Sequence, residues 1–414
     1  MTEEPAAMRI LFLLTQDLES PSGLGRYWPL ARELAGRGHQ VRIAALHSNW
    51  GGLTERCFEK DGVHIEYVAP MHVQKIGSQK RYYSPLSLIG VTLRATWALA
   101  RAALAVPADI LQVGKPHPMN SLAGLLARRI KGGVLCVDCD DYEAGVNRFG
   151  AGWQRRVVEY FEQHVPRRAE LVTTHTQFMR EKLLAWGCPA ERLHYISNGV
   201  DRQHLSLPVP ELVAAMRAQL GLEGKRVVAY LGSLSMPGHP VHLLVEAFKQ
   251  VLESQPQAAL LLVGGGEETH RLQELALHLG IYHSVHFTGR VSPAAMPVYY
   301  ALAEVSVDPV YDDEPARGRS PLKMFESWAA GVPFITAPVG ERAALAGEPP
   351  ASLLASPAGD PNALAVAIVE ILGSPELADQ LRQRGLEQVS HYTWDHLAAQ
   401  MESRYREAVG GQHD

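Results

Sequence analysis

The chain has 414 residues, of which 46% are hydrophobic and 20% charged, with a formal net charge of −5. This composition is typical of a globular protein with two or three cores, and the acidic balance argues against a general nucleic-acid-binding protein. Residues 1–7 are polar and acidic, and the first apolar run, 10–14, is too short for a signal peptide. We therefore expect a cytoplasmic protein.

The first half alternates short apolar runs with helical segments. Between the first strand and a helix from about 27 to 35 lies a loop, 20–26, in which Gly23 and Gly25 would allow the backbone to approach a phosphate or a sugar closely. Strands separated by helices predict βαβ units in a parallel sheet. The predicted strands are 9–14, 41–46, 63–68, 110–113, 134–137, 171–174 and 193–196.

Segment 84–107 is mostly apolar, but Arg94 and Arg101 interrupt it seven residues apart, which predicts an amphipathic helix rather than a membrane span. It follows a basic, aromatic stretch, 75–83. Two interpretations stay open: an ordinary core helix, or a helix that lies against an anionic membrane or a lipid-linked acceptor. The second would place the protein peripherally at the inner face of the membrane.

Four cysteines do not make a disulfide framework. Cys136 and Cys139 form a CxxC in an apolar run that reads as a strand, where residues three apart point to opposite faces. No second CxxC could complete a zinc site, so we expect no metal there.

The second half repeats the alternation of strands and helices after a proline-rich joint at 206–210, with helices such as 241–253 and 268–279 between its strands. The predicted strands are 226–231, 259–263, 285–287, 305–307, 333–336 and 353–354. The fold class is therefore α/β, with two doubly wound Rossmann-like domains facing a central cleft. In such sheets ligands bind outside the carboxyl ends of the strands.

The stretch 318–326 is the most informative. Ser320 fits a helix N-cap and Pro321 the first helical position, so the free N–H groups there would attract phosphate. Lys323 adds a cation in the first turn, which is unfavourable unless an anion lies nearby. Glu326, on about the same face, is placed to accept hydrogen bonds from a ribose diol. The alternative is a capped structural helix with solvated charges.

This stretch resembles the signature of family 4 glycosyltransferases, retaining enzymes of the GT-B fold, in which two glutamates lie eight residues apart. Glu326 matches the second, which binds ribose in the family, whereas Gly318 stands in place of the first, which contacts the donor sugar. Further segments resemble the same family in the right order: 37–41, 196–201, 263–267, 285–291 and 392–394.

The resemblance implies an acceptor-side domain at 1–205, onto which the last helix, about 393–410, packs back, and a nucleotide-sugar-binding domain at 206–390. It also implies a set of donor-binding positions. These are Gly23, Gly25, Gly232, Ser233, Arg290, Val291, Arg319, Ser320, Pro321, Leu322 and Glu326.

The chain departs from the family where basic residues usually hold the diphosphate. The family carries an arginine where Ser233 stands and a lysine near Gly238. The leaving group must then be neutralised by Lys323, by Arg317 or Arg319, or by a metal ion.

The family's histidine beside the donor sugar would align near Cys139, where Asp140 and Asp141 remain at a strand end. Strand alternation argues against Asp138, Asp140 and Asp141 converging on a metal, so a hydrogen-bonding role to sugar hydroxyls is preferred over a solvated acidic turn. Segment 115–117, with Lys115, is a second polar cluster at the same edge, or else a surface loop. The candidate catalytic residues are Lys323, Asp140 and Lys115, and no divalent metal or other cofactor is expected.

These observations predict transfer of a sugar from a nucleoside diphosphate sugar to an acceptor hydroxyl, with retention of configuration. The acceptor could be a saccharide, a lipid-linked molecule or a small molecule. The alternatives are a non-catalytic or repurposed nucleotide-sugar-binding protein, suggested by Gly318, Ser233 and Cys139, and a sugar-nucleotide epimerase.

Overall fold

The structure is a computed structural model that describes residues 6–76, 79–147, 149–201, 208–235 and 238–411. The chain divides into two compact units: an N-terminal unit of Met1–Asn198 with Trp394–Asp414, and a C-terminal unit of Gly199–Thr393. The boundary expected between 205 and 206, and part of the proline-rich joint, lie outside the described residues.

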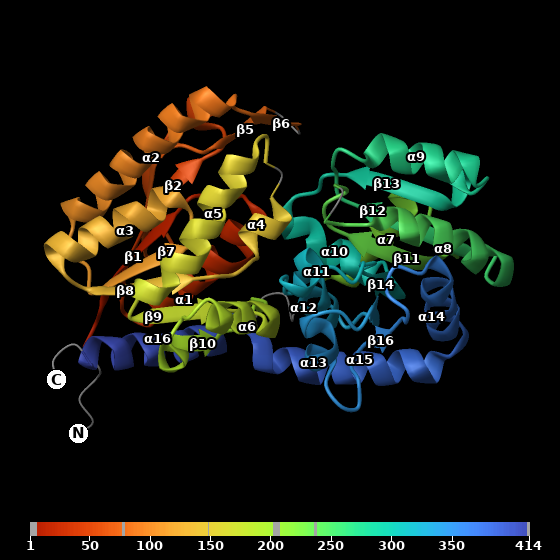
Figure 1. Ribbon diagram of the computed structural model, residues 1–414. Helices are drawn as coiled ribbons and strands as arrows, with labels where there is room; N and C mark the ends of the chain where they lie inside the picture. The colour runs from red at the N-terminus through yellow and green to blue at the C-terminus, as the bar shows by residue number, and fades with distance from the viewer. Residues whose placement is uncertain (1–5, 77–78, 148, 202–207, 236–237, 412–414) are drawn as a thin grey trace, which may run out of the picture. The chain divides into compact units, whose positions relative to one another are not determined.

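The N-terminal unit is built on an eight-stranded sheet in the order β10-β9-β8-β7-β1-β2-β4-β3, parallel except for the antiparallel edge strand β3 (Figure 1). A separate hairpin, β5–β6, follows β4. The strands are β1 (Arg9–Leu14), β2 (Gln40–His47), β3 (Cys57–Lys60), β4 (Val63–Pro70), β5 (Val73–Ile76), β6 (Gln79–Tyr82), β7 (Ile110–Gly114), β8 (Val134–Asp138), β9 (Leu171–Thr174) and β10 (Leu193–Tyr195).

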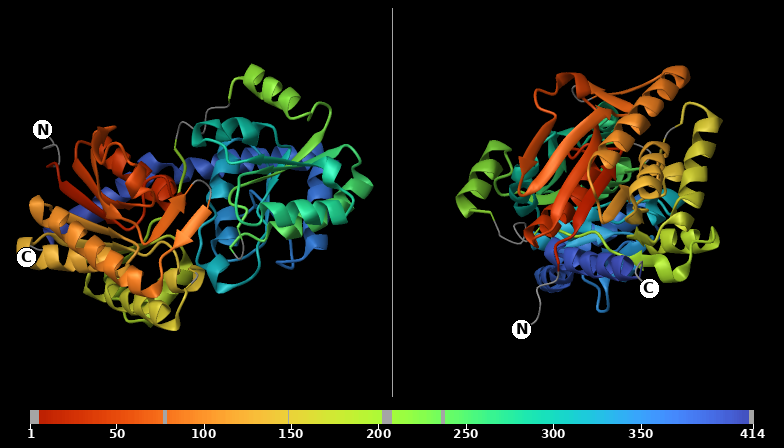
Figure 2. Two further views of the ribbon diagram at one scale, coloured as in Figure 1. Left: turned by 90° about the horizontal axis from the view of Figure 1, so that it is seen from above. Right: turned by 90° about the vertical axis from the view of Figure 1, so that its left-hand side faces the viewer.

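Helices cover both faces of this sheet. One core contains buried residues of α1 (Trp28–Gly36) and α16 (Trp394–Gly410), including Trp394, Leu397, Met401 and Tyr405. The opposite core contains residues of α2 (Pro85–Ala105), α3 (Pro118–Lys131) and α6 (Gln177–Ala185), and α5 (Gly152–His164) packs against it. The right-hand view of Figure 2 shows α2 (orange) and α5 (yellow) on the same side of the sheet.

The C-terminal unit has a six-stranded parallel sheet in the order β13-β12-β11-β14-β15-β16. Its strands are β11 (Arg226–Leu231), β12 (Ala258–Val263), β13 (Val285–Gly289), β14 (Val305–Val307), β15 (Phe334–Thr336) and β16 (Leu353–Leu354). Its helices are α7 (Pro210–Gln219), α8 (Val241–Ser254), α9 (Thr269–His278), α10 (Met296–Ala301), α11 (Glu314–Arg317), α12 (Leu322–Ala329), α13 (Glu341–Ala346), α14 (Pro361–Gly373) and α15 (Pro375–Val389).

The predicted α/β class with two doubly wound parallel sheets is confirmed, and every predicted strand is present to within two residues. In each sheet the strand order reverses at one point, between β7 and β1 in the N-terminal unit and between β14 and β11 in the C-terminal unit. Doubly wound sheets bind ligands outside the carboxyl ends of the strands at this point.

Two local predictions are wrong. The loop expected at 20–26 is largely helical, because Gly23–Tyr27 forms a π-helical turn that leads directly into α1. Ser320 does not cap α12, which begins one residue later than expected with Pro321 at the N-cap position and no capping side chain. Helix α12 ends at Ala329, and Gly331 follows its C-cap residue Ala330 with a left-handed φ of 64°.

Candidate functional site

Glycines bring the carboxyl ends of β11 and β12 into backbone contact. A Cβ atom at Gly264 would lie 1.9 Å from the carbonyl oxygen of Gly232, and one at Gly266 would lie 2.2 Å from that of Leu234. No side chain fits at either position, so these glycines are needed for packing. The N–H of Gly264 also donates to the carbonyl of Gly289 (3.0 Å), which places Arg290 directly beside this edge.

Two cations share one buried carboxylate at the adjoining end of β14. Lys323 Nζ, from the first turn of α12, lies 3.1 Å from Asp308 Oδ1, and Arg342 Nη2 lies 3.1 Å from Asp308 Oδ2. Burial alone would raise the pKa of Asp308, but the charges of Lys323 and Arg342 outweigh it and hold that pKa well below its usual value. The carboxylate of Asp308 is therefore one anion of the kind that the sequence predicted near Lys323.

Basic side chains from the α12 region lie over the loop after β11, where the family's arginine and lysine are missing. Arg319 Nη1 donates to the carbonyl oxygen of Gly238 (2.7 Å), and its guanidinium is 3.0 Å from where a Cβ of Gly238 would be. Lys323 Cε is 2.5 Å from the equivalent position at Gly232. Tyr230 anchors the same loop by donating its hydroxyl hydrogen to the carbonyl of Ser233 (2.8 Å).

This cationic cluster consists of Arg319, Lys323 and Arg342, of which Lys323 and Arg342 pair with the buried carboxylate of Asp308. Burial, followed by the charges of Lys323 and Arg319, lowers the pKa of the nearby His239 well below its usual value, so this imidazole is neutral. Arg317, the other predicted candidate, pairs instead with the exposed Asp312 (2.7 Å). The cluster therefore keeps excess positive charge for an anionic ligand.

The start of α12 differs from the predicted cap but keeps features of a ligand site. The Ser320 hydroxyl is buried and has no hydrogen-bond partner among the described residues, so it is available to a ligand. Glu326, one turn into the helix and partly exposed, accepts a hydrogen bond from the Tyr300 hydroxyl (2.8 Å). Burial, and then Glu326, raises the pKa of Tyr300 well above its usual value, so the tyrosine stays a donor.

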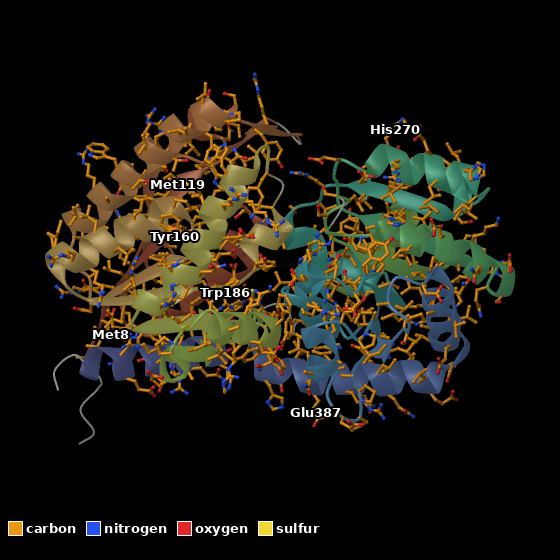
Figure 3. The ribbon with its side chains drawn as sticks, in the orientation of Figure 1. Met8, Met119, Tyr160, Trp186, His270 and Glu387 are labelled. Atoms are coloured by element: carbon orange, nitrogen blue, oxygen red, sulfur yellow. The ribbon has the colours of Figure 1, made fainter. Side chains whose placement is uncertain are left out.

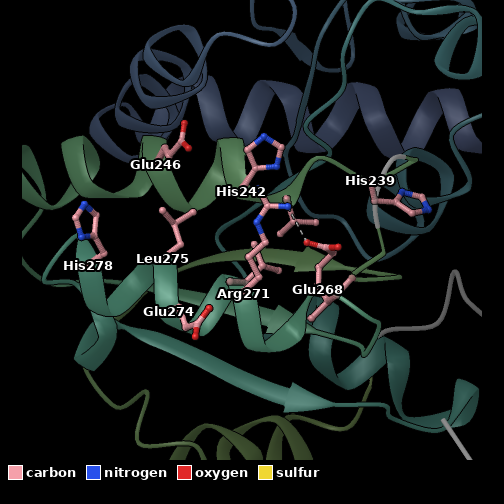
Figure 4. Close-up of a pocket in the computed structure, with 11 residues that line it drawn as sticks. His239, His242, Glu246, Glu268, Arg271, Glu274, Leu275 and His278 are labelled. Atoms are coloured by element: carbon pink, nitrogen blue, oxygen red, sulfur yellow. Dashed lines mark hydrogen bonds and ion pairs between the residues drawn. The ribbon is translucent and has the colours of Figure 1, made fainter. Parts of the chain in front are cut away.

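A cavity of about 320 Å³ lies between α8 and α9 (Figure 4). An ion pair joins Glu268 to Arg271 at its wall (3.3 Å). None of the predicted donor-binding residues lines it, and His239 connects it to the cationic cluster. The lining residues are Leu234, His239, Val241, His242, Glu246, Glu268, Arg271, Leu272, Glu274, Leu275 and His278.

In the N-terminal unit, Lys115 follows β7 directly and has a left-handed φ of 58°. Its Nζ lies 2.5 Å from Glu143 Oε1, 2.8 Å from Asp141 Oδ2 and 3.3 Å from Asp140 Oδ1. His117 Nε2 contacts the other oxygen of Glu143 (2.9 Å). Segment 115–117 is thus part of a buried charged cluster rather than a surface loop.

The charges of this cluster are set by burial and by Lys115. Oxygens of Asp140, Asp141 and Glu143 all lie within 4.8 Å of one another, a spacing that a cation could bridge, and the Lys115 ammonium supplies that cation. Burial raises the pKa of Asp140 to about 8 although Lys115 opposes the shift. Asp140 is therefore largely protonated at neutral pH and can donate as well as accept a hydrogen bond.

Asp138 belongs to a second buried network, so the three carboxylates of Asp138, Asp140 and Asp141 do not all converge, although the neighbouring Asp140 and Asp141 do. Arg26 Nε and Nη2 each donate to Asp138 at 2.7 Å, and the Thr173 hydroxyl donates to it at 2.6 Å. Arg26 Nη1 also donates to Asn198 Oδ1 (2.8 Å). Arg26 was not identified as a site residue from the sequence. Its position in the glycine-rich segment 20–26 is the sequence feature that could have indicated it.

Gly23 has a structural role that does not require a ligand. A Cβ atom there would lie 2.1 Å from the carbonyl oxygen of Asp17. Gly23 and Gly25 sit in the π-helical turn, so they do not form the open phosphate-binding loop that the sequence suggested.

Buried polar atoms without partners collect at the carboxyl edge of the N-terminal sheet. They lie at or just after the ends of β1, β2, β4 and β9 and have no hydrogen-bond partner among the described residues. They are Gln16 Nε2, Asp17 Oδ1, His47 Nε2, His72 Nδ1 and His175 Nδ1. Buried polar groups are normally satisfied, so this edge is suited to a ligand rich in hydroxyl groups.

The two cysteines of the CxxC, Cys136 and Cys139, lie in different cores. Cys136 belongs to the core on one face of the sheet and Cys139 to the core on the other. Both are free thiols. The expectation that the CxxC residues point to opposite faces is confirmed.

Two family profiles match the chain. Residues 22–199 match the "Glycosyl transferase 4-like domain" and residues 225–374 match "Glycosyl transferases group 1". The chain belongs to the group 1, family 4-like glycosyltransferases.

The glycosyltransferase is 26% identical over 266 residues to the GDP-mannose-dependent alpha-(1-6)-phosphatidylinositol monomannoside mannosyltransferase of Mycolicibacterium smegmatis, covering 62% of this chain and 66% of the relative. The match thus spans slightly less than two thirds of that relative. Two solved structures share the fold: sucrose-phosphate synthase of Thermosynechococcus elongatus (TM-score 0.76, 22% identity) and Anabaena Alr3699/HepE in complex with UDP (TM-score 0.71, 19% identity). Each similarity covers 97% of this chain and 100% of the other.

Proposed function

We propose that the glycosyltransferase moves a sugar from a nucleoside diphosphate sugar to an acceptor hydroxyl with retention at the anomeric carbon. The observation that carries this proposal is the cationic cluster beside the glycine-packed ends of β11 and β12, at the point where the strand order reverses. A diphosphate is the anion that best fits three cations held against one carboxylate. The C-terminal unit binds the donor in this proposal.

Each donor group has a partner in the C-terminal unit. Lys323 and Arg319 neutralise the departing diphosphate, replacing the basic residues absent at Ser233 and Gly238. Glu326 accepts hydrogen bonds from the ribose, and the backbone at Arg290 and Val291 reads the base edge. Catalysis is then largely electrostatic, because the fixed charges stabilise the leaving group as its negative charge develops.

The acceptor binds in the N-terminal unit, where Asp140 holds and orients its hydroxyl groups and Lys115 keeps Asp140 in place. The unpartnered atoms of Gln16, His72 and His175 supply further hydrogen bonds at the same edge. Lys115 is already surrounded by carboxylates, so its contribution is to fix their positions.

The donor is a nucleoside diphosphate hexose. The mycobacterial relative is named for GDP-mannose and the Anabaena structure holds UDP, so GDP-mannose and UDP-glucose are the first two donors to test. Gly318 stands where the family has a glutamate that contacts the donor sugar, so one contact to the sugar is absent. A donor sugar other than mannose or glucose is therefore allowed.

The decisive experiment incubates the protein with each donor and a panel of saccharide, inositol and glycolipid acceptors, and analyses both products. Transfer or slow hydrolysis that releases the nucleoside diphosphate supports the proposal. Nucleotide binding by thermal shift with no turnover on any donor would instead indicate a nucleotide-sugar-binding protein. A change in the donor's sugar configuration without net transfer would indicate an epimerase.

A further inference from the structure

Helix α2 is apolar on two opposite sides, of which only one is covered. Ala95, Leu99 and Ala103 are buried against the sheet. On the other side a second row is exposed, with Leu86 at 82%, Leu93 at 66% and Trp97 at 64% of full exposure. The helix is long and apolar enough to cross a membrane, but its inner side packs within the unit, so the outer row is a surface feature.

The exposed row continues onto two neighbouring helices. Helix α3 packs along α2 and contacts α5, and all three cover the same face of the sheet. Their outer apolar residues recur every three or four positions, so each helix presents one stripe; Tyr160 on α5 is labelled in Figure 3. This three-helix face comprises Leu86, Ile89, Leu93, Trp97, Leu122, Leu126, Ile130, Trp153, Val157 and Tyr160. An exposed apolar surface of this extent marks an interaction site.

The charge on the three-helix face is opposite to that of the whole chain. Helices α2 and α3 contain no acidic residue at all, although the chain carries a net charge of −5. On α5, Glu159 is neutralised by Arg155 (3.1 Å). The exposed basic residues on these helices are Arg94, Arg101, Arg129, Lys131, Arg155 and Arg156.

The placement of the cations matches that of amphipathic helices at a membrane interface. The Arg101 guanidinium lies 5.7 Å from the centroid of the Trp97 ring, so an aromatic side chain and a cation share one site on the outer side of α2. Tryptophan and arginine are both favoured at the headgroup level of a bilayer. A partner for this face must therefore offer an apolar layer under a negatively charged surface.

We propose that the three-helix face docks the protein on an anionic lipid bilayer. A second copy of the chain is a poorer partner, because pairing this face with itself would bring two clusters of cations together. The apolar stripes enter the interface while the arginines contact lipid phosphates, and both contributions are needed for stable attachment. This proposal stands apart from glycosyl transfer, since it uses none of the donor-binding or acceptor-binding residues.

The test is co-sedimentation with phosphatidylcholine vesicles, with and without phosphatidylglycerol, over a range of salt concentrations. We expect binding only with phosphatidylglycerol and weakening as salt rises. Arg94→Glu/Arg101→Glu should lower the partition coefficient by at least about fivefold for each arginine. Leu93→Ser/Trp97→Ser should also abolish most binding, at any salt.

Matched controls use exposed residues of the C-terminal unit, Lys249→Glu and Leu277→Ser, which should leave vesicle binding unchanged. Thermal unfolding shows whether each variant is folded. Equal vesicle binding by the wild type and both double variants would overturn the proposal, as would failure of the wild type to bind phosphatidylglycerol vesicles. A dimer detected by light scattering and dissociated by Leu93→Ser/Trp97→Ser would assign the face to a second copy instead.

Discussion

Replacing Lys323 by methionine removes one of the three cations of the cationic cluster. Asp308 keeps Arg342 as a partner at 3.1 Å, so no buried charge is left without compensation. Methionine has a similar volume and helix propensity, and 17% of the lysine side chain is exposed. We therefore expect the variant to fold with little change in its free energy of unfolding.

The expected catalytic effect is larger. A unit charge about 4 Å from the charge developing on the diphosphate stabilises it by about 4 kcal/mol at an effective dielectric constant of 20. Because Asp308 lies 3.1 Å from Lys323 Nζ, it offsets part of that stabilisation. We therefore expect the lower end of the range for one electrostatic donor, about a 100-fold loss in kcat. Arg319 remains, so the activity should not vanish.

The assay is steady-state donor consumption in the presence of EDTA, with Lys249→Met as the control for loss of a lysine elsewhere. A contact that strengthens as the leaving group departs lowers kcat more than it raises the donor KM. A kcat within about threefold of the wild type would remove Lys323 from the diphosphate site. Loss of wild-type activity on adding EDTA would show that a metal ion supplies the charge instead.

Three further outcomes can be measured. Glu326→Ala should weaken nucleoside diphosphate binding in calorimetry by about tenfold, as loss of a charge-assisted hydrogen bond would, whereas Tyr300→Phe should have a smaller effect. Lys115→Met leaves the carboxylates of Asp141 and Glu143 without their cation, so urea unfolding at pH 7 should show a loss of about 3–5 kcal/mol that shrinks at pH 5 as these carboxylates take up protons. Burial lowers the pKa of His175 to about 3, so as the pH falls below 6.5 the unfolded chain binds a proton that the folded protein does not. The free energy of unfolding should therefore fall by up to about 1.4 kcal/mol per pH unit below pH 6.5. A His175→Gln variant with the same slope would show that His175 does not cause it.

The sheets were predictable because their strands are buried on both sides. Runs such as 226–231 and 258–263 are almost wholly apolar and are bounded by turn residues, which identifies a central parallel strand from composition alone. The edge strand Cys57–Lys60 is mostly exposed and has no apolar pattern, so it could not be recognised. The π-helical turn at Gly23–Tyr27 was not predicted for a different reason, because a Ser/Pro/Gly-rich sequence ordinarily indicates a loop.

Spacing along the chain predicted only contacts between neighbouring residues, whereas the shared edge of Lys115 and Asp140 was predicted from their positions after two strands. Lys323 and Glu326 fall within one helix, so their spacing indicates a shared face. The pairing of Arg26 with Asp138 joins residues 112 positions apart, and that of Arg342 with Asp308 joins residues 34 apart. Sequence spacing contains no information about such contacts. Asp308 could still have been suspected, because a polar residue directly after a buried strand lies at the ligand-binding edge.

The position of α16 has a consequence for how the chain folds during synthesis. This last helix supplies Trp394, Leu397, Met401 and Tyr405 to one core of the N-terminal unit, and the Tyr405 hydroxyl donates to Gln112 Oε1 (2.7 Å). The part of this sheet face that α16 covers, beside α1, therefore stays exposed until α16 itself has been synthesised. The C-terminal unit, by contrast, is one continuous segment and can complete its core earlier. The nascent N-terminal unit is thus the part that depends longest on protection from aggregation.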